Sequence, residues 1–126
     1  MKSIIYTEKA PAPIGPYSQA VLTGNMLFIS GQIPLDPATN QLVNGNIGDE
    51  ARQVMMNLDA LLSVSGFSFE NVVKASIFLS DMNHFAEVNE IYGSYFKTDF
   101  PARETVAVLG LPKNVNVEIS VIAVKA

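Results

Sequence analysis

The chain has 126 residues, of which 48% are hydrophobic and 16% are charged. This length is typical of one domain, so we expect a single domain over residues 1–126 with one core. The composition excludes an intrinsically disordered chain. No apolar run reaches the ~18 residues of a membrane span, and the N-terminus lacks the apolar core of a signal peptide.

The net charge is −4, from 8 basic and 12 acidic residues. A protein surface that binds the phosphates of nucleic acids needs a net positive charge, so we expect no nucleic-acid partner. The absence of a long apolar run leads us to expect no membrane partner. Cysteine is absent, which excludes disulfides, thiolate nucleophiles and cysteine metal sites. A histidine metal site or a Ser-His-Asp triad would depend on His84 alone, and we interpret this residue as a surface or capping residue. We therefore expect no metal and a cytoplasmic location.

The first quarter of the chain is typical of β-structure interrupted by a rigid loop. Strands are predicted over Ser3–Tyr6, Tyr17–Thr23 and Met26–Ser30. The three prolines of the segment Ala10–Pro16 prevent regular pairing there. Gly24-Asn25 is a two-residue hairpin signal between the second and third strands.

A polar loop and two helices alternate with strands in the remainder. Leu35–Gly48 is rich in Asp, Asn, Pro and Gly, which predicts a loop. The next segment predicts a helix with Asp49 as N-cap and Gly66 as stop, because apolar residues recur at helical spacing: Ala51, Val54, Met55, Leu58, Leu61 and Leu62. The strand Val72–Leu79 precedes a second helix, whose apolar face is formed by Phe85, Val88, Tyr92, Tyr95 and Phe96. The last predicted strands are Glu104–Leu109 and Val115–Val124.

The order β-β-β-α-β-α-β-β indicates an α+β fold in which two helices cover one face of a sheet. The other face also needs cover, because the second half of the last strand is apolar on both sides. No segment of the chain remains to supply it. We therefore expect a homo-oligomer whose sheet faces pack together.

Arginine is scarce, and its two positions differ in character. Arg52 lies in the first turns of the predicted helix, where solvent is its expected surrounding. Arg103 follows Pro101-Ala102 at the start of a strand, where a rigid guanidinium would bind a carboxylate bidentately. The alternative for Arg103 is a structural ion pair, for example with Glu104.

The other candidate residues each have a structural alternative. Glu118, in the middle of a strand, either faces solvent or holds a water molecule for reaction. Ser30-Gly31 forms either a simple turn or a place where a ligand approaches the backbone. Tyr17 either packs or forms the wall of a small pocket, and Asn89 borders an apolar helix face, where its amide needs a partner.

Several motifs in this order resemble the reactive-intermediate deaminase family (RidA, or YjgF-type proteins). The resemblance covers the full length. It is carried by six stretches: Ile14-Gly15-Pro16-Tyr17-Ser18-Gln19-Ala20; Phe28-Ile29-Ser30-Gly31-Gln32-Ile33-Pro34; Phe85-Ala86-Glu87-Val88-Asn89-Glu90-Ile91-Tyr92; Pro101-Ala102-Arg103; Leu111-Pro112-Lys113; and Val117-Glu118-Ile119.

The resemblance implies a chorismate-mutase-like α+β fold in a homotrimer, with three sheets forming a central barrel and sites in the clefts between subunits. It also implies hydrolysis of 2-imino or 2-enamino acids, such as 2-iminopropanoate and 2-aminoacrylate, to 2-oxo acids and ammonia. No cofactor or metal is implied. The alternative is a trimer that uses the same cleft for small-ligand binding or a chaperone-like role without turnover. RNA cleavage, also reported for the family, is disfavoured by the net charge and the absence of a basic cluster.

The family's functional positions carry over to this chain residue by residue. The carboxylate-binding arginine corresponds to Arg103 and the water-orienting glutamate to Glu118. The substrate-binding positions correspond to Tyr17, Ser30, Gly31, Asn89 and Thr105. Many members have cysteine where this chain has Thr105, which excludes thiol-dependent activity but permits hydrolysis by water. Glu104 is a second departure, and strand alternation predicts that it points away from the side of Arg103.

Overall fold

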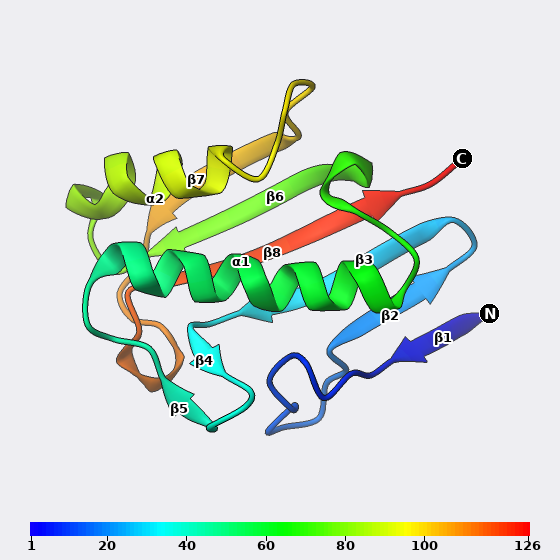
Figure 1. The fold of residues 1–126 in the computed structure, drawn as a ribbon, viewed down its shortest axis with the longest axis horizontal. Helices are drawn as coiled ribbons and strands as arrows, with labels where there is room; N and C mark the ends of the chain where they lie inside the picture. The colour runs from blue at the N-terminus through cyan, green and yellow to red at the C-terminus, as the bar shows by residue number, and fades with distance from the viewer.

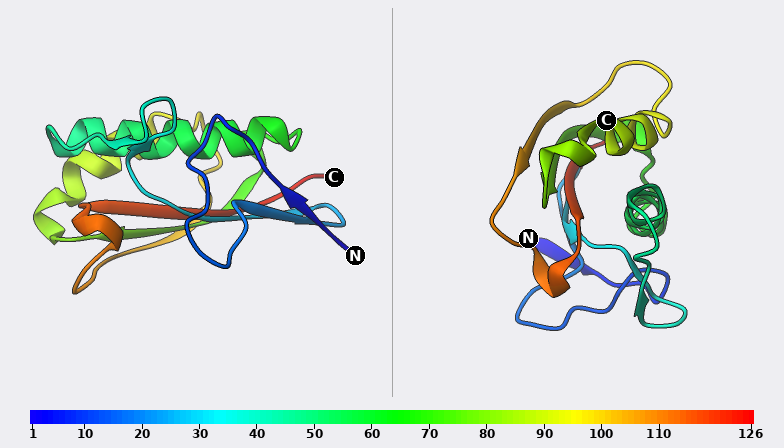
Figure 2. Two further views of the ribbon diagram at one scale, coloured as in Figure 1. Left: turned by 90° about the horizontal axis from the view of Figure 1, so that it is seen from below. Right: turned by 90° about the vertical axis from the view of Figure 1, so that its left-hand side faces the viewer.

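The computed structural model describes residues 1–126 and shows two helices packed on one side of a sheet (Figures 1 and 2). The predicted α+β class and the order of the main elements are confirmed. The helices are α1 (Ile47–Val64) and α2 (Phe85–Gly93). The six sheet strands, in spatial order, are β1 (Lys2–Ile5), β2 (Ala20–Thr23), β3 (Met26–Gln32), β8 (Val117–Val124), β6 (Val72–Leu79) and β7 (Ala102–Ala107).

The sheet is antiparallel except at one edge. β6 and β7 run parallel, and α2 lies in the connection between them (Figure 1). A helical crossover of this kind is the usual way to join parallel neighbours. It places β7 at the sheet edge and brings the α2 side chains over the start of that strand.

The β2–β3 hairpin forms as predicted. Thr23 pairs with Met26 across the two-residue turn, and Gly24 adopts a φ of 57°, as such turns require. At its far end, β3 departs from regular pairing with β8 between Ile29 and Gln32. This bulge changes the direction of the backbone at Ser30 and Gly31.

The predicted strand over Tyr17–Thr23 begins later, at Ala20. The buried side chain of Gln19 explains the difference, because its amide nitrogen donates to three carbonyls of the N-terminal loop: Thr7 at 3.0 Å, Ala10 at 3.2 Å and Pro11 at 2.8 Å. These bonds hold the proline-rich loop against the sheet. The loop rather than a strand therefore positions Tyr17.

Other boundaries also shift. Asn46, not Asp49, is the N-cap of α1, because its side chain accepts a hydrogen bond from the Asp49 amide at 2.9 Å. Gly66 follows the helix end with a φ of 80°, as expected. The predicted loop contains a short hairpin, β4 (Leu35–Asp36) and β5 (Gln41–Leu42). α2 ends at Gly93, before Tyr95 and Phe96, although both rings still pack against the core.

The core lies between the helices and the sheet. Val117, Ile119, Val121 and Ala123 of β8 point into it, and none is more than 3% exposed. The inward face of α1 covers them and includes Leu58, Leu61 and Leu62, all fully buried. The period-two pattern predicted for β8 is thus the pattern observed.

The opposite face of the sheet has no cover within the chain (Figure 2). It carries large apolar side chains that remain partly exposed: Ile4 at 57%, Met26 at 37%, Phe28 at 38% and Val106 at 43%. We call this surface the open face. Neither helix is sufficiently long and apolar to cross a membrane.

Candidate functional site

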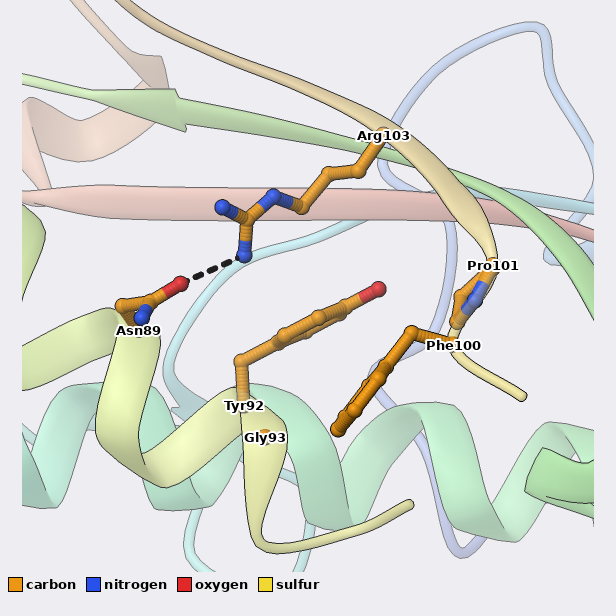
Figure 3. A pocket seen from close by; sticks show the side chains of 6 residues that line it. All are labelled: Asn89, Tyr92, Gly93, Phe100, Pro101 and Arg103. Atoms are coloured by element: carbon orange, nitrogen blue, oxygen red, sulfur yellow. Dashed lines mark hydrogen bonds between the residues drawn. The ribbon is translucent and has the colours of Figure 1, made fainter. Parts of the chain in front are cut away.

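Arg103 lines a pocket between α2 and β7 (Figure 3). The pocket has a volume of about 480 Å³. It is lined by Asn89, Tyr92, Gly93, Phe100, Pro101 and Arg103. Pro101 precedes β7 directly, so the arginine emerges from a backbone that is fixed on both sides.

Three residues of α2 hold the guanidinium. Arg103 Nη1 donates a hydrogen bond to Asn89 Oδ1 at 2.7 Å (Figure 3). The guanidinium carbon lies 5.7 Å from the centre of the Phe85 ring and 5.2 Å from that of Tyr92. Residues 85, 89 and 92 follow the i, i+4, i+7 spacing of one helix stripe. This single hydrogen bond to the Asn89 side chain leaves the other N–H donors of the guanidinium available to a ligand.

No carboxylate of the chain neutralises Arg103, so the structural ion pair considered from the sequence does not form. Glu104 points to the open face, as alternation predicts. There its carboxylate lies 2.8 Å from Lys74 Nζ and accepts a hydrogen bond from the Ser76 hydroxyl. Hydrogen bonds from Lys74 and Ser76 lower the pKa of Glu104. No carboxylate of the chain therefore competes with a ligand for the Arg103 guanidinium.

Two hydroxyl groups on the helix side of the sheet have no partner. Thr105 follows Arg103 by two residues on the same face of β7, and its Oγ1 atom is buried without a hydrogen bond. The buried hydroxyl of Tyr92 also lacks one. Burial raises the pKa of Tyr92 to about 12, and the charge of Arg103 opposes this rise. Tyr92 therefore stays neutral and can donate a proton in a hydrogen bond.

The remaining candidates lie around the β3 bulge. Glu118 is half-buried on the open face, and its carboxylate packs so closely on Gly31 that a Cβ there would overlap it. Burial raises the pKa of Glu118 above its usual range. The Ser30 hydroxyl donates to the Ser18 carbonyl at 2.6 Å, whereas the half-exposed Tyr17 and Gly31 line a small cavity of about 40 Å³.

The structure thus brings the candidates together as two groups. Arg103, Asn89 and Thr105 form the first group, on the helix side of β7. Tyr17, Ser30, Gly31 and Glu118 gather around the β3 bulge and form the second. Within β8, Glu118 alternates with Val117 and Ile119, which point into the core under the helices. Glu118 and Arg103 therefore face opposite sides of the sheet.

The other sequence candidates lie outside both groups. Arg52 is exposed and pairs with Asp49 at 3.2 Å, as expected for a solvated helix position. His84 lies at the start of α2, where its side chain forms no capping hydrogen bond. No cluster of three His, Asp or Glu side chains is placed so that it could hold a metal ion.

Sequence reasoning missed the contribution of Phe85 and Tyr92. The sequence pattern places both on an apolar helix face, and Tyr92 is indeed only 3% exposed. Their spacing from Asn89 was the available signal. What the sequence did not indicate is that Arg103 reaches this stripe and lies over both rings.

The family model described as Endoribonuclease L-PSP matches residues 7–125. The chain belongs to this family. It is 53% identical over 125 residues to a RutC family protein of Pyrococcus horikoshii, with 99% of each chain covered. It is 50% identical to a 2-iminobutanoate/2-iminopropanoate deaminase of Bos taurus, over 99% of this chain and 91% of the bovine protein.

A solved structure gives the same assignment. A protein of unknown function from Yersinia pestis, described as a member of the conserved Rid protein family, superimposes with a TM-score of 0.96 at 48% identity. The match covers 99% of this chain and 100% of the other. The resemblance to RidA and YjgF-type proteins is therefore confirmed.

Proposed function

We propose that this protein is a deaminase that hydrolyses reactive 2-imino and 2-enamino acids to 2-oxo acids and ammonia. The observation that supports this most is Arg103, a guanidinium in a pocket with no carboxylate partner in the chain. A planar, permanently charged fork of this kind is suited to the carboxylate of a small 2-imino acid. Membership of the family and the name of the bovine relative support the same chemistry.

The two groups of candidate residues lead us to propose a homotrimer with sites between subunits. The apolar side chains of the open face would be buried where three sheets pack into a barrel. In that arrangement, Arg103 of one subunit and Glu118 of the next line one cleft. Tyr17, Ser30 and Gly31 accompany Glu118, while Asn89 and Thr105 accompany Arg103.

In the proposed reaction, Arg103 holds the substrate carboxylate and Glu118 accepts a proton from a water molecule. The water oxygen bonds to the imine carbon, and the electron pair of the C=N π-bond moves to nitrogen, which takes the proton from Glu118. Glu118 then accepts the hydroxyl proton of the carbinolamine and passes it to the amine. The C–N bond breaks, ammonia leaves, and the hydroxyl oxygen becomes the 2-oxo group. Burial raises the pKa of Glu118, which makes its carboxylate a stronger proton acceptor than an ordinary glutamate.

A coupled assay tests the proposal. An amino-acid oxidase generates 2-iminopropanoate from alanine, and the decay of the imine is followed with and without the protein. We expect acceleration by the wild type and its loss in Arg103→Ala. Arg52→Ala, which removes the other, exposed arginine, is the matched control and should keep full activity. If several imino acids decay at the same rate with and without wild-type protein, the enzymatic proposal is wrong and binding without turnover is favoured.

A further inference from the structure

Tyr92 lines the Arg103 pocket but has no role in the proposed reaction. The residue is 3% exposed, its ring lies under the guanidinium at 5.2 Å, and its hydroxyl is buried without a hydrogen-bond partner. Figure 3 shows the phenol extending from α2 toward the segment of Phe100 and Pro101. An unpaired buried hydroxyl destabilises a folded chain. Its retention beside an unneutralised arginine therefore indicates a partner that the isolated chain lacks.

The chemistry of this partner follows from the two groups that face it. Arg103 has donors only, and the Tyr92 hydroxyl, whose pKa is raised by burial to about 12, is neutral and carries a proton to donate. The guanidinium and the phenol hydroxyl line one pocket, so an acceptor with at least two oxygens serves both, and the positive charge of Arg103 favours a negative one. A carboxylate meets this requirement.

We propose that Tyr92 is a second ligand-binding residue of this pocket, where its ring supports Arg103 and its hydroxyl donates to the carboxylate that Arg103 binds. This inference rests on the proposed function and names the second donor of the same anion site. In the free chain the hydroxyl is screened from solvent, while Phe100, which lines the same pocket, is 62% exposed. An outward turn of the Phe100 ring is the movement that we expect to admit the ligand oxygen.

Three tyrosine variants separate the ring from the hydroxyl. Tyr92→Phe removes only the hydroxyl, and Tyr92→Leu removes the ring as well. Tyr95→Phe is the matched control, since Tyr95 follows the same helix but does not line this pocket. Calorimetric titration with pyruvate, the 2-oxo product of 2-iminopropanoate, measures the dissociation constant, and thermal unfolding reports stability.

We expect Tyr92→Phe to weaken pyruvate binding about tenfold, because a hydrogen bond to a charged group is lost. Its melting temperature should equal or exceed that of the wild type, because the hydroxyl has no partner in the free chain. Tyr92→Leu should weaken binding further, and Tyr95→Phe should change nothing. A purely structural role would lower the melting temperature and leave affinity intact.

The outcomes distinguish this inference from the proposed function. If Arg103→Ala abolishes pyruvate binding but Tyr92→Phe binds like the wild type, Tyr92 is not a ligand-binding residue and the deaminase proposal stands. An equal loss in Tyr92→Phe and Tyr95→Phe also overturns the inference, because the effect is then not specific to this pocket. If the wild type neither binds pyruvate nor accelerates imine decay, both proposals are wrong.

Discussion

Arg103 and Glu118 project from opposite faces of the same sheet. Arg103 on β7 pairs with Ala75 of β6, which in turn pairs with Val121, whereas Glu118 pairs with Phe78. The arginine contacts α2 on the covered side, and the glutamate packs on Gly31 on the open face. A substrate with a three-carbon skeleton cannot contact both within one chain, so the proposed reaction requires a second copy.

The first prediction follows from this separation. Arg103→Ala and Glu118→Gln should each be inactive alone, but subunits mixed from the two variants should regain activity. In a closed ring of head-to-tail contacts, random mixing leaves about one quarter of the sites with an intact arginine from one subunit and an intact glutamate from the next. The coupled imine assay measures the recovery after the two variants are refolded together.

The mixing experiment needs proof that exchange took place. Native mass spectrometry with one variant isotopically labelled shows the composition of the oligomers. If mixed trimers form and remain inactive, the two residues do not serve one shared site. A mixture of wild type and Arg103→Ala at the same ratio is the control for loss of activity by dilution alone.

The second prediction concerns stability and pH. Burial raises the pKa of Glu118, so the folded chain keeps this proton at pH values at which the unfolded chain, with a pKa of about 4.3, has released it. The cost of ionising Glu118 in the folded state is absent below the unfolded pKa and grows as the pH rises through the folded pKa. Glu118→Gln should therefore be more stable than the wild type at pH 7.

This stability difference should disappear as the pH is lowered toward about 4, where the wild-type carboxyl is also neutral. Urea unfolding at a series of pH values measures it. Glu8→Gln, at an exposed position, controls for the loss of one negative charge. A stability gain of the same size at every pH would show that packing of the amide, rather than ionisation of Glu118, is responsible.

The third prediction concerns Gly31, which has no positive φ but lies directly under the Glu118 carboxylate. An alanine Cβ would overlap that carboxylate and force it to move. Because the overlapping atoms lie at the end of a flexible side chain, we expect Gly31→Ala to lower the free energy of unfolding by only about 1 kcal/mol, the low end for overpacking, and to lower deaminase activity by displacing Glu118. Chemical denaturation and the imine assay measure the two effects.

Two further variants make this prediction specific. Gly45→Ala places a Cβ in open space and should be neutral. Combining Gly31→Ala with Glu118→Ala should relieve the loss of stability, since the overlapping group is gone. If the changes in the free energy of unfolding caused by the two substitutions simply add, the proposed overlap is wrong.

The sequence predicted those parts of the fold that local periodicity and turn chemistry determine. The alternation in β8, the turn at Gly24-Asn25 and the helix stop at Gly66 all have local causes. The late start of β2 was not predictable, because it depends on bonds from Gln19 to carbonyls 8 to 12 residues away. A cap at Asn46 rather than Asp49 likewise depends on which of two suitable residues reaches the helix amides.

In the candidate site, too, the sequence predicted what local pattern determines and not what contacts between separate segments determine. Alternation alone predicted that Glu104 would turn away from Arg103. The pattern of α2 predicted a buried Tyr92 but gave no sign that its hydroxyl would be left unpaired, because that depends on how α2 packs against β7 and the segment between them. The two-group arrangement of the candidates became visible only when both faces of the sheet were known.

The last prediction concerns the ion pair on the open face. Lys74 and Glu104 lie 2.8 Å apart, and both side chains are partly exposed in the single chain. If three sheets pack through this face, the pair becomes buried, and removal of one partner leaves an uncompensated charge in the interface. Glu104→Ala should then shift the trimer toward monomers, which analytical ultracentrifugation over a dilution series measures. Asp49→Ala, which breaks the exposed Arg52–Asp49 pair on α1, is the matched control. Equal dissociation constants for the two variants would show that the open face is not where the subunits meet. High salt should not reproduce the effect of Glu104→Ala, because buried ion pairs are screened less than exposed ones.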